Sequence, residues 1–162
     1  RLFNNWSDPE YLDAFFYKHR DDLQKEFYDF ISIEDAITQT RKESMRLEKR
    51  IKEIAEKGNE NDFQSLQTLF KPLYKREEEL INIPSHQRSK AYGDYHKSWL
   101  RIYAIRIEKN VFIITGGAIK LTENMNEREH LLKELEKIKM VKQFLINEQI
   151  IDNDSIIELL EL

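Results

Sequence analysis

Two apolar runs in the second half of the chain, residues 99–107 and 111–120, constrain the fold more than any other feature. Both runs are rich in isoleucine, valine and aromatic residues, and the short polar stretch 108–110 joins them. Runs of this composition separated by a short polar turn are typical of a β-hairpin. The second run is nearly continuous in apolar residues, which predicts a central strand that is buried on both faces.

Helical patterns precede the β-hairpin. The first helix is predicted to begin within the run 7–10. Ser7 and Glu10 form a capping-box pair there, and an early proline lies between them. A second helix runs from Ser32 to about residue 57, because its apolar and small residues recur every three or four positions. The third covers about 62–80, and Pro72 is expected to kink or shorten it. The second and third helices together predict an antiparallel helical hairpin.

After the β-hairpin, the apolar spacing predicts a helix over about 126–147 and a short amphipathic helix over about 153–162. The whole pattern predicts an α+β fold. N-terminal helices, including the helical hairpin, precede a small antiparallel sheet built on the β-hairpin at about 99–120, and C-terminal helices follow. We expect a single domain over 1–162. Its parts would be a helical N-terminal extension (1–60), a core (61–147) and a short C-terminal helix (148–162).

Composition excludes several classes of protein. The hydrophobic fraction of 40% is too high for a disordered chain. The absence of cysteine excludes a disulfide scaffold, a thiolate metal site and a cysteine nucleophile, and it fits a reducing cytosol. No apolar run approaches the ~18 residues of a membrane span, and no signal-peptide pattern opens the chain. We therefore expect a cytoplasmic protein without a membrane partner.

The formal net charge of −4 conceals an uneven distribution. Residues 86–120 carry seven basic and two acidic side chains, whereas acidic residues predominate in 1–40 and 121–162. A basic stretch can serve as a phosphate-binding surface only if folding gathers it onto one face of the protein. Ordinary solvated charge is the alternative. The charge pattern therefore leaves nucleic acid open as a ligand without establishing it.

Arg101, Tyr103 and Lys120 are the candidate site residues on the predicted strands. Alternate side chains of a strand share a face, so Arg101 and Tyr103 should lie together, with Leu100 and Ile102 on the opposite face. Arginine presents a planar set of donors to phosphate, and a tyrosine ring can stack on a base. In the alternative interpretation Arg101 pairs with a helix carboxylate and Tyr103 only packs. Lys120 would then simply extend into water from the strand end.

The segment before the first strand, residues 86–97, is basic with interleaved aromatic residues. Cations that hold phosphates and rings that stack on unpaired bases suit RNA, although a solvated loop is the alternative. The candidate RNA-binding residues are Arg88, Lys90, Tyr92, Tyr95 and Lys97. His86 and His96 add groups that can carry out acid–base chemistry. Since the histidines of the chain are scattered, we expect no metal site.

Gly116 and Gly117 interrupt the second predicted strand. Glycine inside a strand weakens packing, so the pair predicts a β-bulge or a close approach of another segment to the backbone. The surrounding sequence lacks the strand–loop–helix context and the lysine spacing of a phosphate-binding loop.

The order of parts from about residue 63 to residue 145 resembles the RelE/ParE toxin superfamily, most nearly its HigB-like branch. The matching stretches are LFKPL at 69–73 and WLRIYAIRIEKNVFIITGGAIKLTENM at 99–125. Arg101 and Tyr103 match the arginine-bearing strand of that family, and Lys120 matches the ending of the next strand. Leu121 stands where a second lysine is common in the family.

The resemblance implies a RelE-like fold and the toxin component of a bacterial toxin–antitoxin system. Such a toxin is a small endoribonuclease that needs neither metal nor cofactor and acts on RNA, including mRNA on the ribosome. A cognate antitoxin protein inhibits it. A ribose 2′-OH would attack the adjacent phosphate while cations stabilise the phosphoryl oxygens. The catalytic residues that the resemblance implies are Arg101, Lys120, Tyr103 and His96, with His96 as the best acid–base group.

Two other functions are compatible with the same residues. The scaffold could bind RNA or protein without catalysis, as in the ParE-like branch, which acts on gyrase. The acidic ends and the predicted helical hairpin could instead form a surface for a protein partner. Convergence of Arg101, Tyr103, Lys120 and His96 in one concave patch would favour the RNA site.

Overall fold

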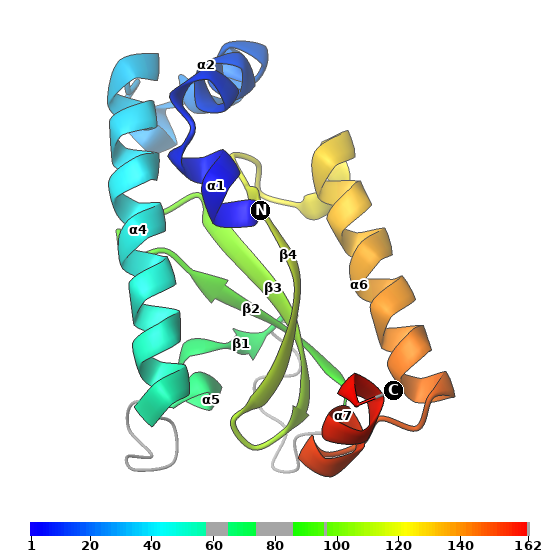
Figure 1. Ribbon diagram of the computed structural model, residues 1–162. Coiled ribbons are helices and arrows are strands. Elements are labelled where there is room, and N and C mark those ends of the chain that lie inside the picture. Colours follow the sequence, from blue (N-terminus) through cyan, green and yellow to red (C-terminus); the bar gives the residue numbers. More distant parts are fainter. Residues whose placement is uncertain (58–64, 74–85, 96, 162) are drawn as a thin grey trace.

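A four-stranded antiparallel sheet separates two groups of helices in the computed structural model, which describes residues 1–57, 65–73, 86–95 and 97–161 (Figure 1). The N-terminal helices pack on one face of the sheet and the C-terminal helices on the other. Each helix group buries its apolar stripe against the sheet, so the molecule has one core on each face. The predicted α+β class and the order of its parts are confirmed.

The N-terminal helices are α1 (Leu2–Ser7), α2 (Pro9–Lys18), α3 (Arg20–Leu23), the 3-10 helix η1 (Glu26–Tyr28) and α4 (Ile33–Lys57). Helix α1 was not predicted, and it ends at Ser7, where the next helix was expected to begin. Asp8 caps α2 instead, because its carboxylate accepts the backbone N–H groups of Glu10 and Tyr11. The predicted cap was therefore wrong by one residue.

Helix α4 confirms the predicted long helix. The Ser32 hydroxyl caps it by accepting the backbone N–H of Asp35 at 3.1 Å. The stripe predicted from the spacing packs on the sheet, since Leu47 and Ile51 are buried in the same core as Trp99. Because α4 spans the whole sheet, it is the main cover of that face (Figure 1).

The helix predicted over about 62–80 is wrong in the part that the structure describes. Only Leu66–Leu69 is helical (α5), and Lys71–Pro72 forms the short strand β1. Phe70 between them is extended and buried, and its ring stacks on Phe112 at 5.0 Å. Proline has no N–H to donate, so it fits an edge strand. Hence α5 does not form a helical hairpin with α4 within the described residues.

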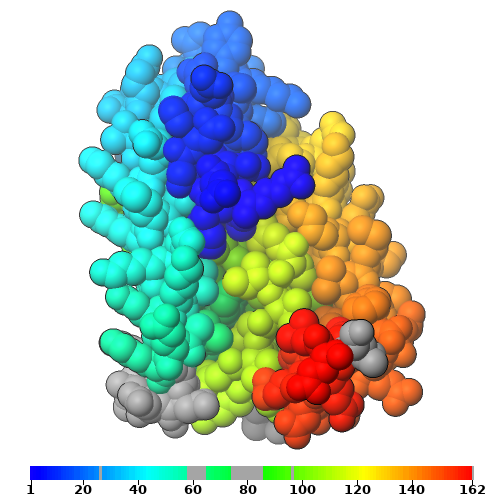
Figure 2. All heavy atoms as spheres, in the orientation of Figure 1, coloured from blue at the N-terminus to red at the C-terminus, as the bar shows by residue number. Residues whose placement is uncertain are grey.

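The sheet continues from β1 through β2 (Gln87–Tyr92), β3 (Leu100–Glu108) and β4 (Val111–Ile119), in chain order. Strands β3 and β4 confirm the predicted β-hairpin, and Asn110 in its turn has a left-handed φ of 63°. The prediction that the second hairpin strand is central is wrong, because β4 lies at the edge and β3 is central. In β4, Val111, Phe112 and Ile113 are half-buried and Ile114 is exposed, and atoms of the strand remain visible between α4 and α6 in Figure 2.

The glycine pair of β4 lies at a β-bulge, as predicted. The register against β3 shifts here and leaves Thr115 as the extra residue before Gly116. A Cβ on Gly117 would lie 2.6 Å from the carbonyl oxygen of Arg101 and 2.7 Å from the side chain of Leu2. Gly117 therefore permits the close approach of α1 to the edge of the sheet.

The sheet is followed by the 3-10 helix η4 (Met125–Glu127), α6 (Glu129–Asn147) and α7 (Asn153–Leu160). Helices α6 and α7 confirm the two predicted C-terminal helices. Leu131, Ile138 and Leu145 of α6 are buried in the same core as Tyr103 and Ile105 of β3. Among the described residues, no helix is both long and apolar enough to cross a membrane.

Candidate functional site

Strand alternation brings several predicted site residues to one face of the sheet. Lys90 and Tyr92 of β2 stand opposite Tyr103 and Arg101 of β3 in the register, and Lys120 directly follows β4. These five side chains line one cavity of about 630 Å³, here called the cationic cavity. It lies on the face that α6 covers, since Leu135 of α6 is part of its wall. The other described residues of its wall are Leu73, Glu123, Asn124, Met125 and Asn126.

Arg101 is held in the cationic cavity by neutral groups. Its Nη1 donates to the backbone carbonyls of Ser98 and Leu100, at 2.7 and 2.8 Å. The guanidinium carbon lies 4.2 Å from the centre of the Tyr92 ring, which is a cation–π contact. Burial lowers the pKa of Arg101, but a guanidinium stays protonated in proteins. Within the described ranges Arg101 forms no salt bridge, so the helix carboxylate of the alternative interpretation is not found there.

The two lysines of the cationic cavity also bind backbone carbonyls. Lys120 Nζ donates to the carbonyls of Thr122 and Glu123, and Lys90 Nζ donates to the carbonyl of Leu73 at 2.8 Å. Burial lowers the pKa of Lys120, and the nearby cations Arg101 and Lys90 lower it further. An ammonium has three donors, so each lysine retains at least one for a ligand. The cavity thus gathers three cations, and Glu123 is the single carboxylate residue among the described residues of its wall.

Tyr103 contributes an unpaired hydroxyl. Its side chain is 1% exposed, and the hydroxyl has no hydrogen-bond partner among the described residues. Buried tyrosine hydroxyls usually find a partner, so this donor is available to a molecule that enters the cavity. Burial strongly raises the pKa of Tyr103. The hydroxyl therefore keeps its proton at neutral pH and can donate a hydrogen bond.

Residues 87–92 form strand β2, so the solvated-loop alternative is wrong for that part of the basic segment. Ser89 and Ala91 of β2 are buried, and the intervening Arg88, Lys90 and Tyr92 lie on the other face. Arg88 thus shares the face of the cationic cavity but does not line it.

Tyr95 and Lys97 lie with the N-terminal helices instead. The guanidinium carbon of Arg46 in α4 stands 5.9 Å from the centre of the Tyr95 ring, and Lys97 Nζ binds the Asp29 carboxylate at 2.8 Å. Neither residue lines the cationic cavity. His96, the predicted acid–base residue, lies outside the described residues.

Sequence reasoning missed Glu43, a completely buried carboxylate of α4. Its Oε1 accepts the backbone N–H of Tyr95 at 3.1 Å, and the side chain also hydrogen-bonds Ser98. A Cβ on Gly93 would collide with the same oxygen, so the position requires glycine. Burial raises the pKa of Glu43, and these hydrogen bonds oppose the rise. Glu43 therefore fixes Ser98, whose carbonyl in turn holds Arg101. Its place in an apolar stripe was the available sequence signal.

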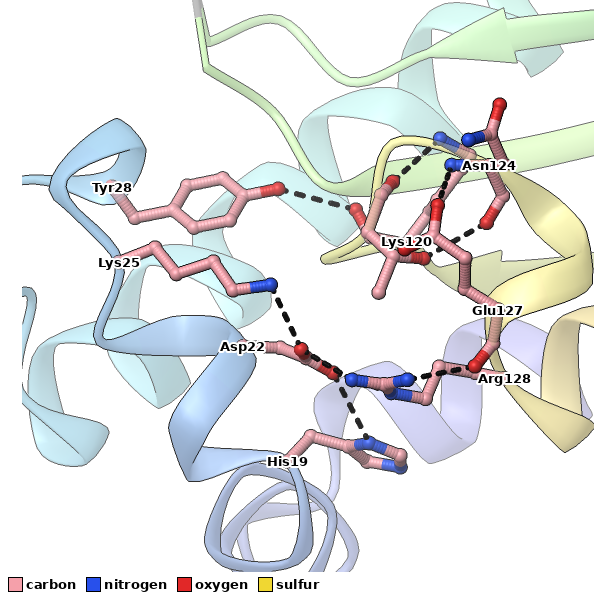
Figure 3. A network of polar contacts seen from close by, with 9 residues as sticks. His19, Asp22, Lys25, Tyr28, Lys120, Asn124, Glu127 and Arg128 are labelled. Carbon is pink, nitrogen blue, oxygen red and sulfur yellow. Dashed lines mark hydrogen bonds and ion pairs between the residues drawn. The ribbon is translucent and has the colours of Figure 1, made fainter.

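A second missed group links the N-terminal helices to the segment after β4 (Figure 3). Asp22 is 3% exposed and accepts two hydrogen bonds from Arg128, at 2.7 and 2.6 Å, and one from Lys25 at 3.1 Å. Burial would raise the pKa of Asp22, but these hydrogen bonds prevail and hold it below its usual value. The Tyr28 hydroxyl donates to the backbone carbonyl of Lys120 at 3.3 Å.

A second cavity, of about 710 Å³, lies between α1, α2 and α6 over the glycine pair, and is called the histidine cavity below. The rings of His19 and His130 meet in its wall with their centres 4.9 Å apart. Its charged residues are largely paired: Lys133 with Glu129, Lys137 with Glu134 and Arg128 with Asp22. The described part of the chain contains no cluster of three or more acidic or histidine residues that could hold a metal ion.

The candidate site is thus the cationic cavity, with Lys90, Arg101 and Lys120 around the Tyr103 hydroxyl. The arrangement suits an anion, because cations and a hydroxyl donor converge on one space. Neither a family model nor a curated protein nor a solved structure matches the chain.

Proposed function

We propose that the chain is a metal-independent endoribonuclease that holds an RNA phosphate in the cationic cavity. The observation that carries the proposal is the convergence of Lys90, Arg101 and Lys120, which donate to backbone carbonyls and so keep their full charge. Tyr92 supplies a half-exposed ring at the rim, on which a base can stack. The proposal includes the RelE-like scaffold, nearest the HigB-like branch, and the role of toxin in a toxin–antitoxin pair.

Cleavage would follow from these side chains. The 2′-oxygen forms a bond to the adjacent phosphorus, and the bond from phosphorus to the 5′-oxygen breaks. Arg101 and Lys120 stabilise the negative charge that grows on the phosphoryl oxygens. Lys120 also protonates the leaving 5′-oxygen, a task for which its lowered pKa suits it. The proton of the 2′-OH passes to a base, and His96 is the residue that the sequence predicts for this step.

The partners follow from the same proposal. RNA, including mRNA on the ribosome, is the substrate, and a cognate antitoxin protein would cover the site. No cofactor takes part in the proposed steps, because proton transfer and charge stabilisation are both supplied by side chains.

RNA binding without cleavage is the second candidate function. It is favoured by the chemistry of the described cavity, where Tyr103 keeps its proton and no described residue of the wall is a histidine. The same three cations and the Tyr92 ring would then serve only to hold the strand.

One experiment separates these functions. A labelled single-stranded RNA oligonucleotide is incubated with the protein in EDTA, and binding is followed by fluorescence anisotropy while products are resolved on a gel. Arg101→Ala and Lys120→Ala are compared with Lys139→Ala, which removes an exposed charge of α6 outside the cavity. Cleavage that both cavity variants lose supports the nuclease, and binding without cleavage supports the second function. The absence of binding, or equal binding by all variants, would overturn both.

A further inference from the structure

One wall of the cationic cavity is an irregular segment between β4 and α6. Lys120, Glu123, Asn124, Met125 and Asn126 all belong to it. Beyond the backbone bond from Lys120 N–H to the Trp99 carbonyl, no strand pairing with another described residue supports this segment, and η4 is its sole helical turn. Leu121 is anchored in the core, and hydrogen bonds join Thr122 to Asn124 and Asn124 to Glu127 within the segment. Contacts made by the two ends of the segment add to this local support and help to set the shape of the wall.

Both ends of the segment are bound by the N-terminal helices (Figure 3). At its start, the Tyr28 hydroxyl donates to the Lys120 carbonyl at 3.3 Å. At its end, Arg128 donates from Nε and Nη2 to the two oxygens of Asp22, at 2.7 and 2.6 Å. We call these two contacts, made by Asp22 and Tyr28, the N-terminal clamp.

The clamp bears directly on the orientation of one cation. Two of the three Lys120 ammonium donors bind the carbonyls of Thr122 and Glu123, which lie within the clamped segment. The direction of the third donor follows from those two carbonyls. A shift of the segment would turn this donor away from the cavity or leave it bound elsewhere.

We propose that Asp22 is a positioning residue for Lys120, so that the N-terminal helices set the geometry of the cationic cavity. The role in RNA binding rests on the function proposed above. Asp22 is suited to this task because it is buried, and a buried carboxylate strongly favours keeping its hydrogen-bonded cation. A partner that displaces the N-terminal helices would thereby change the orientation of the Lys120 ammonium without touching the cavity.

The first test measures Lys120 itself and needs no RNA. The protein is treated with a limiting amount of an amine-acylating reagent, and labelling of each lysine is quantified by mass spectrometry. We expect Asp22→Asn to change the labelling of Lys120 by at least about twofold relative to Lys139, because residues of one network couple at that scale or above. The matched control is Asp21→Asn, which removes the same charge from an exposed neighbour and should change nothing.

The second test is a double-mutant cycle on RNA affinity. We expect Asp22→Asn to weaken binding of a single-stranded RNA oligonucleotide by about three- to tenfold in the wild-type background. In a Lys120→Ala background the same substitution should cost almost nothing, since it acts through Lys120. If Asp22 had a merely structural role, Asp22→Asn would weaken RNA binding by the same factor in both backgrounds.

The outcomes distinguish this inference from the proposed function. Unchanged Lys120 labelling in Asp22→Asn overturns the inference, whether or not RNA binding changes. Additive effects of the two substitutions on RNA affinity in the double-mutant cycle overturn it as well. Changed labelling in a protein that binds no RNA overturns the proposed function and leaves the clamp standing. Should Asp22→Asn fail to fold, as judged by circular dichroism, Tyr28→Phe takes its place. It removes a single hydroxyl at the other end of the clamp and should shift Lys120 labelling in the same direction.

Discussion

The two cavities that border α6 differ in how their basic residues are bonded. Among the described residues, three lysine and arginine side chains line the cationic cavity and five line the histidine cavity. In the cationic cavity Lys90, Arg101 and Lys120 donate to backbone carbonyls, which carry no net charge. In the histidine cavity Lys133 and Lys137 bind carboxylates of their own helix. Positive charge thus remains for a ligand in the first cavity, whereas three of the five lysine and arginine residues of the second are paired with carboxylates. The bonding of basic residues is therefore a better sign of an anion site than their number.

The strongest test of this contrast removes two cations from each cavity. The Arg101→Ala and Lys120→Ala double variant should lose RNA affinity by about 100-fold or more, because each charge-assisted contact contributes ~1.5–3 kcal/mol. The Lys133→Ala and Lys137→Ala double variant should change affinity by about twofold at most, since exposed paired charges contribute little. Anisotropy titrations at one fixed salt concentration measure both. If the two double variants lost RNA affinity to a comparable extent, the two cavities would not differ in anion binding.

A second test compares two ion pairs at the histidine cavity. Arg128→Ala leaves the buried Asp22 with Lys25 as its cation, and should clearly lower the free energy of unfolding. Lys133→Ala breaks an exposed pair on α6 and should leave the free energy of unfolding almost unchanged. Urea unfolding followed by circular dichroism gives both values. An equal effect of the two substitutions would mean that burial of Asp22 does not matter.

A third test concerns the unpaired hydroxyl of the cationic cavity. Tyr103→Phe removes a buried donor that has no partner in the described part of the chain, so the free energy of unfolding should stay within ~0.5 kcal/mol or rise. RNA affinity should nevertheless fall by about threefold to tenfold if the hydroxyl binds the ligand. Paired measurements of stability and affinity separate these effects. Unchanged affinity would remove Tyr103 from the site and leave it a packing residue.

The smallest expected effect is a pH dependence in the histidine cavity. Burial lowers the pKa of His19 below 6.5, His130, Lys18 and Arg128 lower it further, and Asp22 opposes them. The folded state then binds fewer protons than the unfolded state, so this stabilisation is complete above pH 6.5. It is lost as the pH falls toward the folded-state pKa.

His19→Gln cannot bind the proton and should flatten this part of the profile. The free energy of unfolding of the wild type should decrease more between pH 7.5 and pH 5.5 than that of the variant, by less than ~1 kcal/mol. Urea titrations at the two pH values provide the comparison. A steeper decrease in His19→Gln would show that the sign of the shift is reversed.

Local periodicity carried most of the fold prediction. The three- and four-residue spacing of α4 and α6, and the two-residue alternation of β3, are properties of single elements and were recognised without tertiary information. The same alternation placed Arg101 with Tyr103, which are both in the cationic cavity. The spacing rule misled at Phe70, because a buried residue in an extended segment can repeat at helical intervals by coincidence.

The remaining errors arose where tertiary context decides. Strand β2 was missed because its buried positions include Gln87 and Ser89, so polar residues occupy the positions where an apolar pattern was sought. The position of β4 at the edge depends on β1 and β2, which the sequence did not reveal as strands. Asp22 and Arg128 have no local signal, since each is an ordinary charged residue until folding joins them.

The N-terminal clamp joins residues that are far apart in the chain. Asp22 and Arg128 are separated by 106 positions, and Tyr28 and Lys120 by 92. At a synthesis rate of ~5–20 residues per second, Arg128 is made at least several seconds after Asp22. The residues of the N-terminal helices are therefore synthesised before the segment that they hold. The last wall of the cationic cavity is completed late, so the site remains incomplete during most of the synthesis of the chain.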